Sequence, residues 1–476
     1  MTIAALAAGP ANAVILPPFG GNISGSGQTA GSPPVMSAAP IAVTPATVDV
    51  TTTKLRSIPA SYYFGFSFES SETDLSNIFS TTGEYPALLK NLGYGVLRFG
   101  GNSVDRATFH GITASNLNSL AALVSATGWK VNYSENLGHY VANQVTSDAG
   151  AVSRKLGAHL LAFACGNEPE HFPALLLRPA SYTEAMYLTE VAKCFAAIHA
   201  GAPGAPVSGP NTYHVAWLPP YAAAVKAGKL HVSSLDEQYY PMTHCGQTPT
   251  PGGSTTLLSR TTASNEAAQL NSIASSAAVA GTPFVLGETN SASCTGIPDM
   301  SNTYAAALWA VDWALLAAEK GATGIYFHGG LSTTCTSYTP ICKTGPGKYV
   351  AEPVYYGLLF AHMLGSGQML QTTISTRANI AAHAVTSGGK ISVVVENLSA
   401  TPSALTLNVP GVSGTASVLH LTGSSLAATW GVRIQGAALS PSGTITPGAA
   451  TPVTCTAGVC KLTIAADSAV IVHLPA

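Results

Sequence analysis

Two glutamates that each follow a short apolar run are the residues of this sequence best suited to chemistry. Glu168 comes just after residues 160–165, within Gly166-Asn-Glu-Pro169, and Glu288 closes the run 283–287. Such runs are too short for a helix and are typical of buried strands, and the proline after Glu168 cannot continue a central strand. If both strands belong to one barrel, the carboxylates meet at its carboxyl-terminal edge, where catalytic groups collect. Hydrolysis of a glycosidic bond requires such a pair.

Other acidic residues compete for these two roles. The residues alone do not choose among the strand-end acids, which are Glu69, Asp105, Glu135, Glu168, Glu170, Glu237 and Glu288. Glu170 lies two positions after Glu168, so an extended backbone would point both side chains the same way. A solvated or ion-paired glutamate is the ordinary alternative for any one of them.

The elements that must position these residues alternate from Tyr62 onward. Short strand-like runs are predicted at residues 63–68, 95–99, 130–133, 160–165, 207–209, 232–239, 284–286 and 325–327. Helices are predicted at residues 86–92, 117–125, 151–156, 181–200, 221–227, 266–278, 304–320 and 354–363. Ser181-Tyr-Thr-Glu184 has the spacing of a capping box, and Gly321 is expected to end its helix. Eight such units predict a (β/α)8 TIM barrel. An open doubly wound sheet is the alternative, disfavoured because no Gly-x-Gly-x-x-Gly follows any predicted strand.

After Leu370 the sequence changes to short β-branched runs separated by glycine, proline and serine. Residues 390–396, 405–409 and 469–474 are examples, and they predict a C-terminal antiparallel β-sandwich. Residues 41–53 have the same texture and are expected to add an N-terminal strand to it. The predicted domains are therefore a leader and flexible lead-in (1–40), the N-terminal strand of the sandwich (41–55), a catalytic α/β barrel (56–368) and the β-sandwich (369–476).

Composition excludes several kinds of partner. Charged residues make up 9% of the chain, and 20 Lys+Arg stand against 22 Asp+Glu, without a basic block that could neutralise nucleic acid. No apolar run reaches the length of a membrane span. Ile3 to Ala8 followed by Ala11-Asn-Ala13 resembles an export signal without its positive region, so the N-terminus is either a short or truncated signal or a disordered leader.

The cysteines are even in number, eight in all. Cys455 and Cys460 flank a predicted hairpin loop, Cys335 and Cys342 flank another loop, and Cys245 and Cys294 would lie on neighbouring barrel loops. Cys165 and Cys194 remain, on a strand and the helix after it. Four disulfides would indicate an oxidising compartment, and eight free buried thiols are the alternative. With the apolar leader, this favours a secreted or periplasmic protein.

Several motifs, in order along the chain, resemble glycoside hydrolase family 79, the heparanase and β-glucuronidase family. The resemblance covers residues 64–357 and continues in the strand pattern at the end. Its motifs are Leu97-Arg-Phe-Gly-Gly-Asn-Ser103, Gly166-Asn-Glu-Pro169, Gln238-Tyr-Tyr-Pro241, Gly287-Glu-Thr-Asn-Ser291, and Phe327-His-Gly-Gly330 followed by Tyr338-Thr-Pro-Ile341. The resemblance implies a retaining mechanism with Glu168 as acid/base and Glu288 as nucleophile. Glu168 should then stay protonated and Glu288 ionised in the free enzyme.

The same resemblance implies a set of substrate-binding residues. Tyr239 matches best, and Tyr240 next, a tyrosine beside the nucleophile, with aromatic packing as the alternative. Asn167 would bind the hydroxyl next to the anomeric carbon. Glu69 is expected to bind sugar hydroxyls, with a structural glutamate as the alternative, and Asn102 and His328 are expected in the substrate pocket. Backbone N–H groups near Cys294 to Gly296 would bind a uronate carboxylate together with Tyr338, with an ordinary loop tyrosine as the alternative. The loop Ser-Cys-Thr-Gly lacks an aromatic residue that some relatives carry.

These features predict an exo-β-glucuronidase that releases terminal glucuronic acid, with the 4-O-methylated sugar as a second candidate substrate. An endo-acting, heparanase-like enzyme is the alternative, disfavoured because lysine and arginine are few and scattered. A carbohydrate-binding barrel without catalysis is the other. No cofactor and no metal are expected, because no His-x-x-x-His or Cys-x-x-Cys spacing groups the 13 histidines or the cysteines.

Overall fold

Eight parallel strands form a nearly closed barrel in the computed structural model, which describes residues 42–74, 79–246 and 253–475. Each strand pairs with barrel strands that adjoin it along the chain, and the first pairs with the last. Between the fourth and fifth strands a parallel bridge from Phe163 to Val207 completes the circle. The strands are β2 (Phe64–Glu69), β3 (Val96–Gly100), β4 (Lys130–Glu135), β5 (Leu160–Cys165), β6 (Ser208–Thr212), β7 (Ser234–Tyr239), β9 (Phe284–Thr289) and β11 (Ala322–His328).

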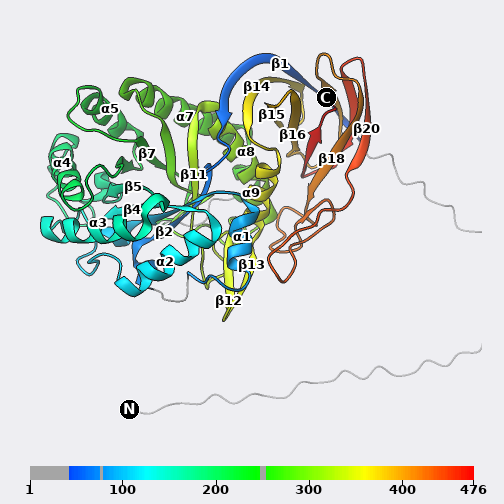
Figure 1. The fold of residues 1–476 in the computed structure, drawn as a ribbon. Helices are drawn as coiled ribbons and strands as arrows, with labels where there is room; N and C mark the ends of the chain where they lie inside the picture. The colour runs from blue at the N-terminus through cyan, green and yellow to red at the C-terminus, as the bar shows by residue number, and fades with distance from the viewer. Residues whose placement is uncertain (1–41, 75–78, 247–252, 476) are drawn as a thin grey trace, which may run out of the picture. The chain divides into compact units, whose positions relative to one another are not determined.

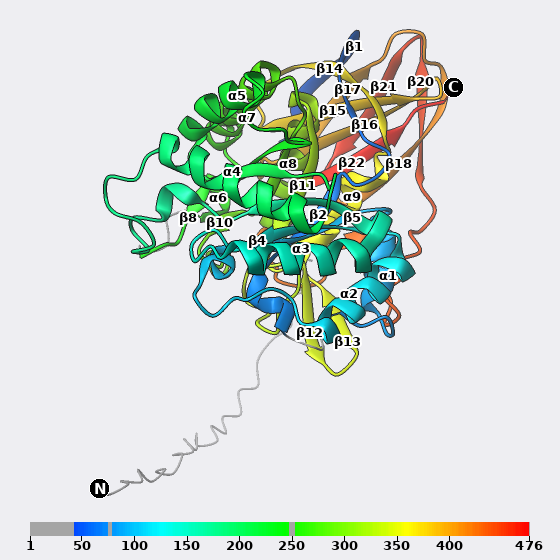
Figure 2. The ribbon, with the colours of Figure 1, turned by 60° about the vertical axis from the view of Figure 1, so that its left-hand side comes forward.

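Helices lie on the outside of these strands (Figures 1 and 2). They cover the outer face, so the strands are buried on both faces, as parallel strands generally are. The helices are α1 (Tyr85–Asn91), α2 (Ala114–Thr127), α3 (Ala142–Leu156), α4 (Glu184–Gly201), α5 (Leu218–Lys226), α6 (Gly253–Leu257), α7 (Arg260–Ala280), α8 (Tyr304–Lys320) and α9 (Pro353–Met363). No helix in the described ranges is long and apolar enough to cross a membrane.

Hydroxyl and glycine residues set the helix limits. Ser259 accepts a hydrogen bond from the N–H of Thr262 at the start of α7, and Gly321 ends α8 in the left-handed conformation, as predicted. The capping residue of α4 is Thr183, which accepts from the N–H of Met186, so the cap predicted at Ser181 is wrong. Both residues are good N-caps, and only the structure decides between them.

All eight predicted barrel strands are confirmed within a few residues of their limits. The sequence missed the first turns of α3 and α7 and all of α6. It also missed two small sheets beside the barrel, whose strands are β8 (Met242–Thr243) with β10 (Ala292–Ser293), and β12 (Ile341–Gly345) with β13 (Lys348–Ala351). These strands are too short for alternation of apolar and polar residues to reveal them.

A second, separate sheet contains ten strands from the rest of the chain. Strand β18 pairs with both β20 and β22, so nine of the strands form one continuous ring. Its members are β1 (Thr44–Ile58), β14 (Gly367–Thr376), β15 (Ile380–Ser387), β16 (Lys390–Asn397), β17 (Ser403–Asn408), β18 (Gly414–Thr422), β19 (Arg433–Ile434), β20 (Thr451–Thr456), β21 (Val459–Ile464) and β22 (Ser468–His473).

The N-terminal strand β1 lies between two C-terminal strands, antiparallel to β14 and parallel to β17. The part of the chain before the barrel therefore completes the second sheet. The leader and lead-in expected at 1–40 lie outside the described residues. The limits 41–55, 56–368 and 369–476 stay predictions, because the chain from Ala42 onward groups as one compact unit.

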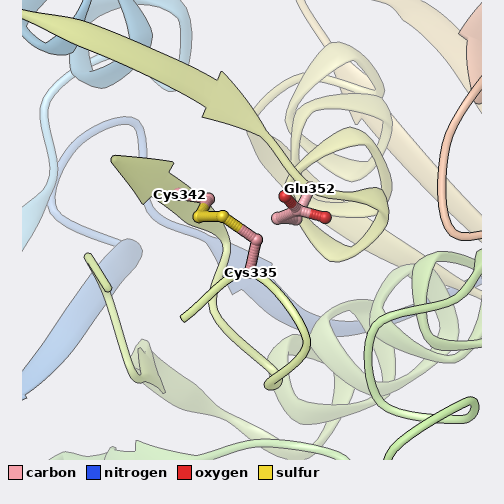
Figure 3. Close-up of side chains that lie close together, drawn as sticks. All are labelled: Cys335, Cys342 and Glu352. Atoms are coloured by element: carbon pink, nitrogen blue, oxygen red, sulfur yellow. A yellow bond between two sulfur atoms is a disulfide. The ribbon is translucent and has the colours of Figure 1, made fainter. Parts of the chain in front are cut away.

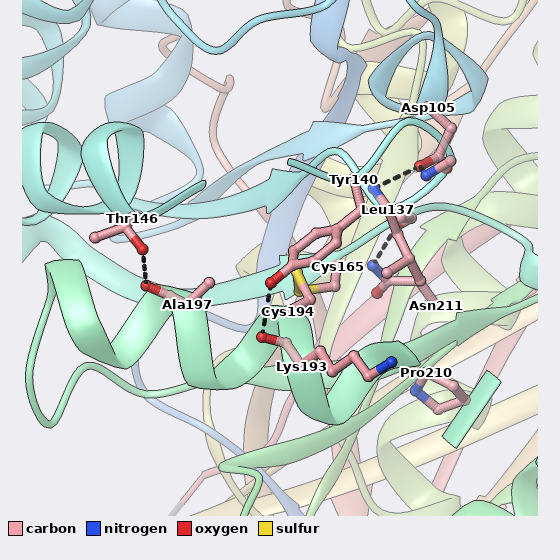
Figure 4. The surroundings of a disulfide bond; sticks show 12 residues. Asp105, Leu137, Tyr140, Thr146, Cys165, Lys193, Cys194, Ala197, Pro210 and Asn211 are labelled. Atoms are coloured by element: carbon pink, nitrogen blue, oxygen red, sulfur yellow. Dashed lines mark hydrogen bonds between the residues drawn. A yellow bond between two sulfur atoms is a disulfide. The ribbon is translucent and has the colours of Figure 1, made fainter. Parts of the chain in front are cut away.

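Four disulfides join the cysteines in the predicted pairs, and the free-thiol alternative is wrong. Cys165–Cys194 ties the end of β5 to α4 (Figure 4), and Glu168 follows Cys165 by three positions in the chain. Two hydrogen bonds join α4 in turn to the neighbouring segment around α3, from the Tyr140 hydroxyl to the Lys193 carbonyl and from the Thr146 hydroxyl to the Ala197 carbonyl, both 3.0 Å. The strand end before Glu168 is thus held covalently to a helix that is itself held by polar contacts.

Candidate active site

Glu168 and Glu288 line one pocket of about 630 Å³ at the carboxyl-terminal ends of the barrel strands. Among the other acids named as competitors, Glu69 also lines it. Four competitors have partners elsewhere or lie away from its walls. Asp105 binds backbone N–H groups of the next loops, Glu170 accepts from the N–H groups of Tyr213 and His214, Glu237 accepts from Gln269 of α7, and Glu135 is buried near Asp148. The competing acids on the pocket wall are therefore the predicted pair and Glu69, and Glu72, whose pKa burial raises to about 8, lines the same pocket.

Three side chains hold the carboxylate of Glu288, which lies on β9. Arg98 donates to Oε2 at 2.5 Å, the Tyr240 hydroxyl donates to Oε1 at 2.7 Å, and His328 Nδ1 lies 3.5 Å from Oε2. Burial alone would raise the pKa of this carboxyl. His328, Arg98 and the hydrogen bond from Tyr240 outweigh burial, and the pKa of Glu288 is lowered. A buried carboxyl with a lowered pKa that lines the pocket is suited to act as a nucleophile.

Arg98 connects the two halves of the site and was missed by the sequence interpretation. Its side chain on β3 is fully buried, and it donates to Asn167 Oδ1 at 2.8 Å and to Ser67 Oγ at 3.0 Å, as well as to Glu288. Gly100 is required beside it, because a Cβ at that position would overlap the guanidinium. The sequence feature that could have revealed its role is an arginine within an otherwise apolar strand, because a buried cation needs a paired anion.

Glu168 follows β5 in a left-handed backbone conformation, with φ of 47°. This conformation is costly for a residue with a side chain, and the bond from its N–H to the Asn211 carbonyl, 2.8 Å, helps to hold it. His171 Nδ1 lies 3.2 Å from Oε2, and the side chain of Glu168 is 12% exposed. Burial raises the pKa of Glu168, the nearby Glu288 raises it further, and the contact with His171 opposes both. A carboxyl with a raised pKa at the pocket wall is suited to general acid catalysis.

Asn167 is buried behind Glu168, and its contacts are already taken within the protein. Its Oδ1 accepts from Arg98, its Nδ2 donates to Asn102 Oδ1 at 3.2 Å, and its N–H donates to Asp105 Oδ2 at 2.8 Å. The amide of Gln238 lies 2.7 Å from Asn167 Oδ1 and 3.0 Å from Glu168 Oε1, so its NH2 group donates to whichever oxygen it faces. Asn102 is exposed and lines the pocket, so it is the member of this pair that a ligand can reach.

The structure places Tyr240, and not Tyr239, beside Glu288. Side chains alternate along β7, and the carboxyl of Glu237 points toward α7. Tyr239 therefore also points outward, and its ring packs against Trp313 of α8 with centroids 5.2 Å apart. The preference for Tyr239 is a correction, because adjacent tyrosines at a strand end can be told apart only by the register of the strand.

Glu69 and His328 lie together on the wall of the pocket next to Glu288. Glu69 Oε2 accepts from the N–H of Ser103 at 2.7 Å, and its side chain is 32% exposed. His328 Nε2 lies 3.9 Å from Glu69 Oε1, while its Nδ1 is 3.0 Å from Ser67 Oγ. His328 thus spans the distance between the two acids, and Glu69 keeps oxygen surface toward the cavity.

The loop after β9 lies against Tyr338. Cys294, Thr295 and Gly296 have φ of 56°, 69° and 84°, so three successive residues are left-handed. The Cys245–Cys294 disulfide and the bond from the Ser337 hydroxyl to the Thr295 carbonyl, 2.8 Å, hold the loop in place. Cys294, Thr295 and Tyr338 line the pocket, and a Cβ on Gly296 would come within 2.9 Å of the Tyr338 ring. Burial raises the pKa of Tyr338, so its hydroxyl stays protonated and can donate.

Two groups of residues in the described ranges could hold a metal ion, and neither includes a residue of this pocket. The first group is Cys335, Cys342 and Glu352. Its two sulfurs are bonded to each other (Figure 3), so they are not thiolates and cannot serve as metal ligands. The second group, Asp312, His383 and Glu396, lies at the second sheet.

Comparison with known proteins gives a class for this fold. No family model matches the sequence. Over 219 residues, 42% of this chain and 39% of the relative, the chain is 29% identical to a β-glucuronidase of Neurospora crassa. Over 87 residues, 18% of this chain and 16% of the relative, it is 34% identical to a β-glucuronidase of Aspergillus niger. The matched segments thus span less than half the length of either relative.

Solved structures match over nearly the whole chain. A 4-O-α-L-rhamnosyl-β-D-glucuronidase from Fusarium oxysporum has a TM-score of 0.74 at 21% identity, covering 90% of this chain and 100% of that one. A family 51 arabinofuranosidase from Xanthomonas axonopodis pv. citri has a TM-score of 0.67 at 13% identity, covering 91% and 100%. The chain therefore has the fold that these two glycoside hydrolases share. Its sequence relatives within that class are β-glucuronidases.

Proposed function

We propose that this protein is a retaining exo-β-glucuronidase of glycoside hydrolase family 79, with Glu168 as acid/base and Glu288 as nucleophile. One observation carries the proposal. Of the four carboxyls among the described residues that line the pocket, Glu168 and Glu288 have pKa values shifted in opposite directions, that of Glu168 raised by burial and that of Glu288 lowered by His328, Arg98 and Tyr240. Opposed pKa values in one site assign an acid and a base.

In the first step, Glu168 gives its proton to the glycosidic oxygen while Glu288 attacks the anomeric carbon. The leaving group departs as an alcohol, and the sugar is bound to Glu288 as an ester. In the second step, the ionised Glu168 takes a proton from water, which displaces Glu288 and leaves the sugar in its original configuration. This mechanism requires the two carboxyl groups to be about 5 to 5.5 Å apart, which stays a prediction.

The loop after β9 and Tyr338 would bind the carboxylate of the glucuronyl ring. A left-handed run of backbone can present successive N–H groups to an anion, and the Tyr338 hydroxyl adds a neutral donor. Glu69 and Asn102, both on the pocket wall, would bind sugar hydroxyls. Asn167 would act mainly through Arg98 and Asn102, because its own amide is buried behind them.

Two alternatives remain from the sequence. An endo-acting enzyme for sulfated chains would need a cationic cleft, and Arg106 is the one lysine or arginine among the described residues that line the pocket. A non-catalytic sugar-binding barrel would have no need to hold one carboxyl ionised and another protonated. Four disulfides support a secreted or periplasmic site of action, because they persist in oxidising compartments.

The experiment is hydrolysis of p-nitrophenyl β-glucuronide, compared with the β-glucoside and β-galactoside. Release from the glucuronide alone is expected, with the β-anomer of glucuronic acid seen first by proton NMR. An oligosaccharide with a terminal glucuronic acid should lose that sugar and keep the rest of its chain intact. Equal activity on the three glycosides, or first appearance of the α-anomer, would contradict the proposal.

A further inference from the structure

A buried cluster of charged side chains lies where α8 meets the second sheet, outside the proposed active site. His383 on β15 lies between two carboxylates of α8, with Nε2 2.8 Å from Asp312 Oδ1 and Nδ1 2.8 Å from Glu319 Oε1. The side chain of His383 is 5% exposed, and those of Asp312 and Glu319 are 14% and 16% exposed. The cluster is therefore mostly buried, and it contains more carboxyl groups than the single histidine can pair with as a cation.

Glu396 on β16 adds a third carboxyl to this cluster. It is fully buried, and neither of its oxygens has a hydrogen-bond partner. One ligand atom each from Glu396, Asp312 and His383 lie within 4.8 Å of one another. A buried carboxyl without a partner is costly, and it points to a group that satisfies it.

We propose that Asp312, His383 and Glu396 bind one divalent metal ion, for which Zn²⁺ is the best fit. Carboxylate oxygens and imidazole nitrogens, the two kinds of donor present here, are both zinc ligands. Glu319 completes the arrangement, because it accepts from His383 Nδ1–H. On metal binding, Nε2 would give up its proton and its hydrogen bond to Asp312, and both atoms would face the ion instead. Such a carboxylate–histidine–metal chain fixes the tautomer and the orientation of the ring.

The ion has a route to the site and room for a further ligand. Asp312 and His383 line a cavity of about 380 Å³ between α7, α8 and β15. Three protein ligands leave a fourth position of the tetrahedron for water from that cavity. The ion would join α8 of the barrel to β15 and β16 of the second sheet, so its role is to hold these two parts together and it takes no part in hydrolysis.

The test uses tag-free, full-length protein. Its metal content is measured by mass spectrometry, and after treatment with EDTA it is titrated with ZnCl2 by calorimetry. We expect one Zn²⁺ per chain, a higher Tm with Zn²⁺ than with EDTA, and little effect of Ca²⁺ or Mg²⁺. The variants H383Q and E396Q should bind Zn²⁺ at least about 100-fold more weakly, and E319Q about 10- to 100-fold more weakly.

The matched control is E352Q, which changes a buried glutamate outside the cluster. It should bind Zn²⁺ like the wild type. Absence of Zn²⁺ binding by the wild type, or equal binding by H383Q and E396Q, would overturn the proposal and leave the cluster as a protonated ion-pair network. Hydrolysis by the EDTA-treated protein is measured in parallel, so failure here is distinguishable from failure of the proposed function.

Discussion

Replacing Tyr240 with phenylalanine removes one hydrogen bond from the proposed nucleophile and little else. The Tyr240 hydroxyl donates to Glu288 Oε1 at 2.7 Å, and this bond is among the contacts that lower the pKa of Glu288. A hydrogen bond to a charged group contributes about 1.5 to 3 kcal/mol. Its loss should make ionised Glu288 less favourable, while Arg98 and His328 still hold it.

The consequence appears on the acidic side of the pH profile. On the acidic limb of the pH profile, the ionised fraction of Glu288 limits kcat/KM. There the kcat/KM of Y240F should be about 10- to 100-fold lower than that of the wild type. The limb itself should move to higher pH. On the plateau the loss should be smaller, because the nucleophile gives up its charge as it bonds to the sugar.

The assay is kcat/KM for p-nitrophenyl β-glucuronide across the acidic range, with Y239F as the matched control. Tyr239 packs against Trp313 away from Glu288, so Y239F should keep the wild-type acidic limb. The reasoning is refuted if Y240F and the wild type share one acidic limb, or if Y239F moves it as far as Y240F does.

Three further predictions concern the acid/base, the pH range and the disulfides. E168Q should lose about 10²- to 10⁴-fold in kcat/KM on glucuronides with poor leaving groups and far less on a dinitrophenyl glucuronide; equal losses would argue against general acid catalysis by Glu168. The wild-type profile should be bell-shaped. The acidic limb should lie below the usual pKa of glutamate, because the pKa of Glu288 is lowered. The basic limb should lie above the usual pKa of glutamate, because the pKa of Glu168 is raised. An acidic limb above that value, or a basic limb below it, would contradict the assignment. The double variant C165A/C194A should have a free energy of unfolding in urea about 3 to 4 kcal/mol lower than the wild type, because the disulfide closes a loop with a sequence separation of 29. Unchanged stability would mean that the disulfide does not stabilise the packing of β5 against α4.

The pattern of the sequence was enough to predict the barrel strands and a set of acidic residues at their ends, while the choice of Glu168 and Glu288 among those acids rested on the resemblance to a known family. A buried strand that ends in Gly-Asn-Glu-Pro or Gly-Glu-Thr leaves its acidic residue at the carboxyl-terminal edge, and eight such units close in only a few ways. Three disulfides followed from the positions of predicted loops, and Cys165–Cys194 was the pair that remained. Such features depend on order along the chain, which a sequence displays.

The features that the sequence did not predict depend on strand register and on contacts between residues that are distant along the chain. Tyr239 ends β7 and Tyr240 follows it, so the two differ only in the direction of their side chains, and Ser181 and Thr183 differ only in which one begins α4. Arg98 pairs with residues far along the chain, so its motif was visible while its role was not. The ring formed by β18 with β20 and β22 likewise has no local signal.

The most direct test of the central claim is to trap the proposed glycosyl-enzyme. The protein is incubated with 2-deoxy-2-fluoro-β-glucuronyl fluoride, digested, and mapped by tandem mass spectrometry. The account predicts one fluoroglucuronyl group per chain, attached to Glu288, with its turnover slowed in E168Q. A label on Glu69 or another acid, or no label while the fluoride is hydrolysed, would contradict it.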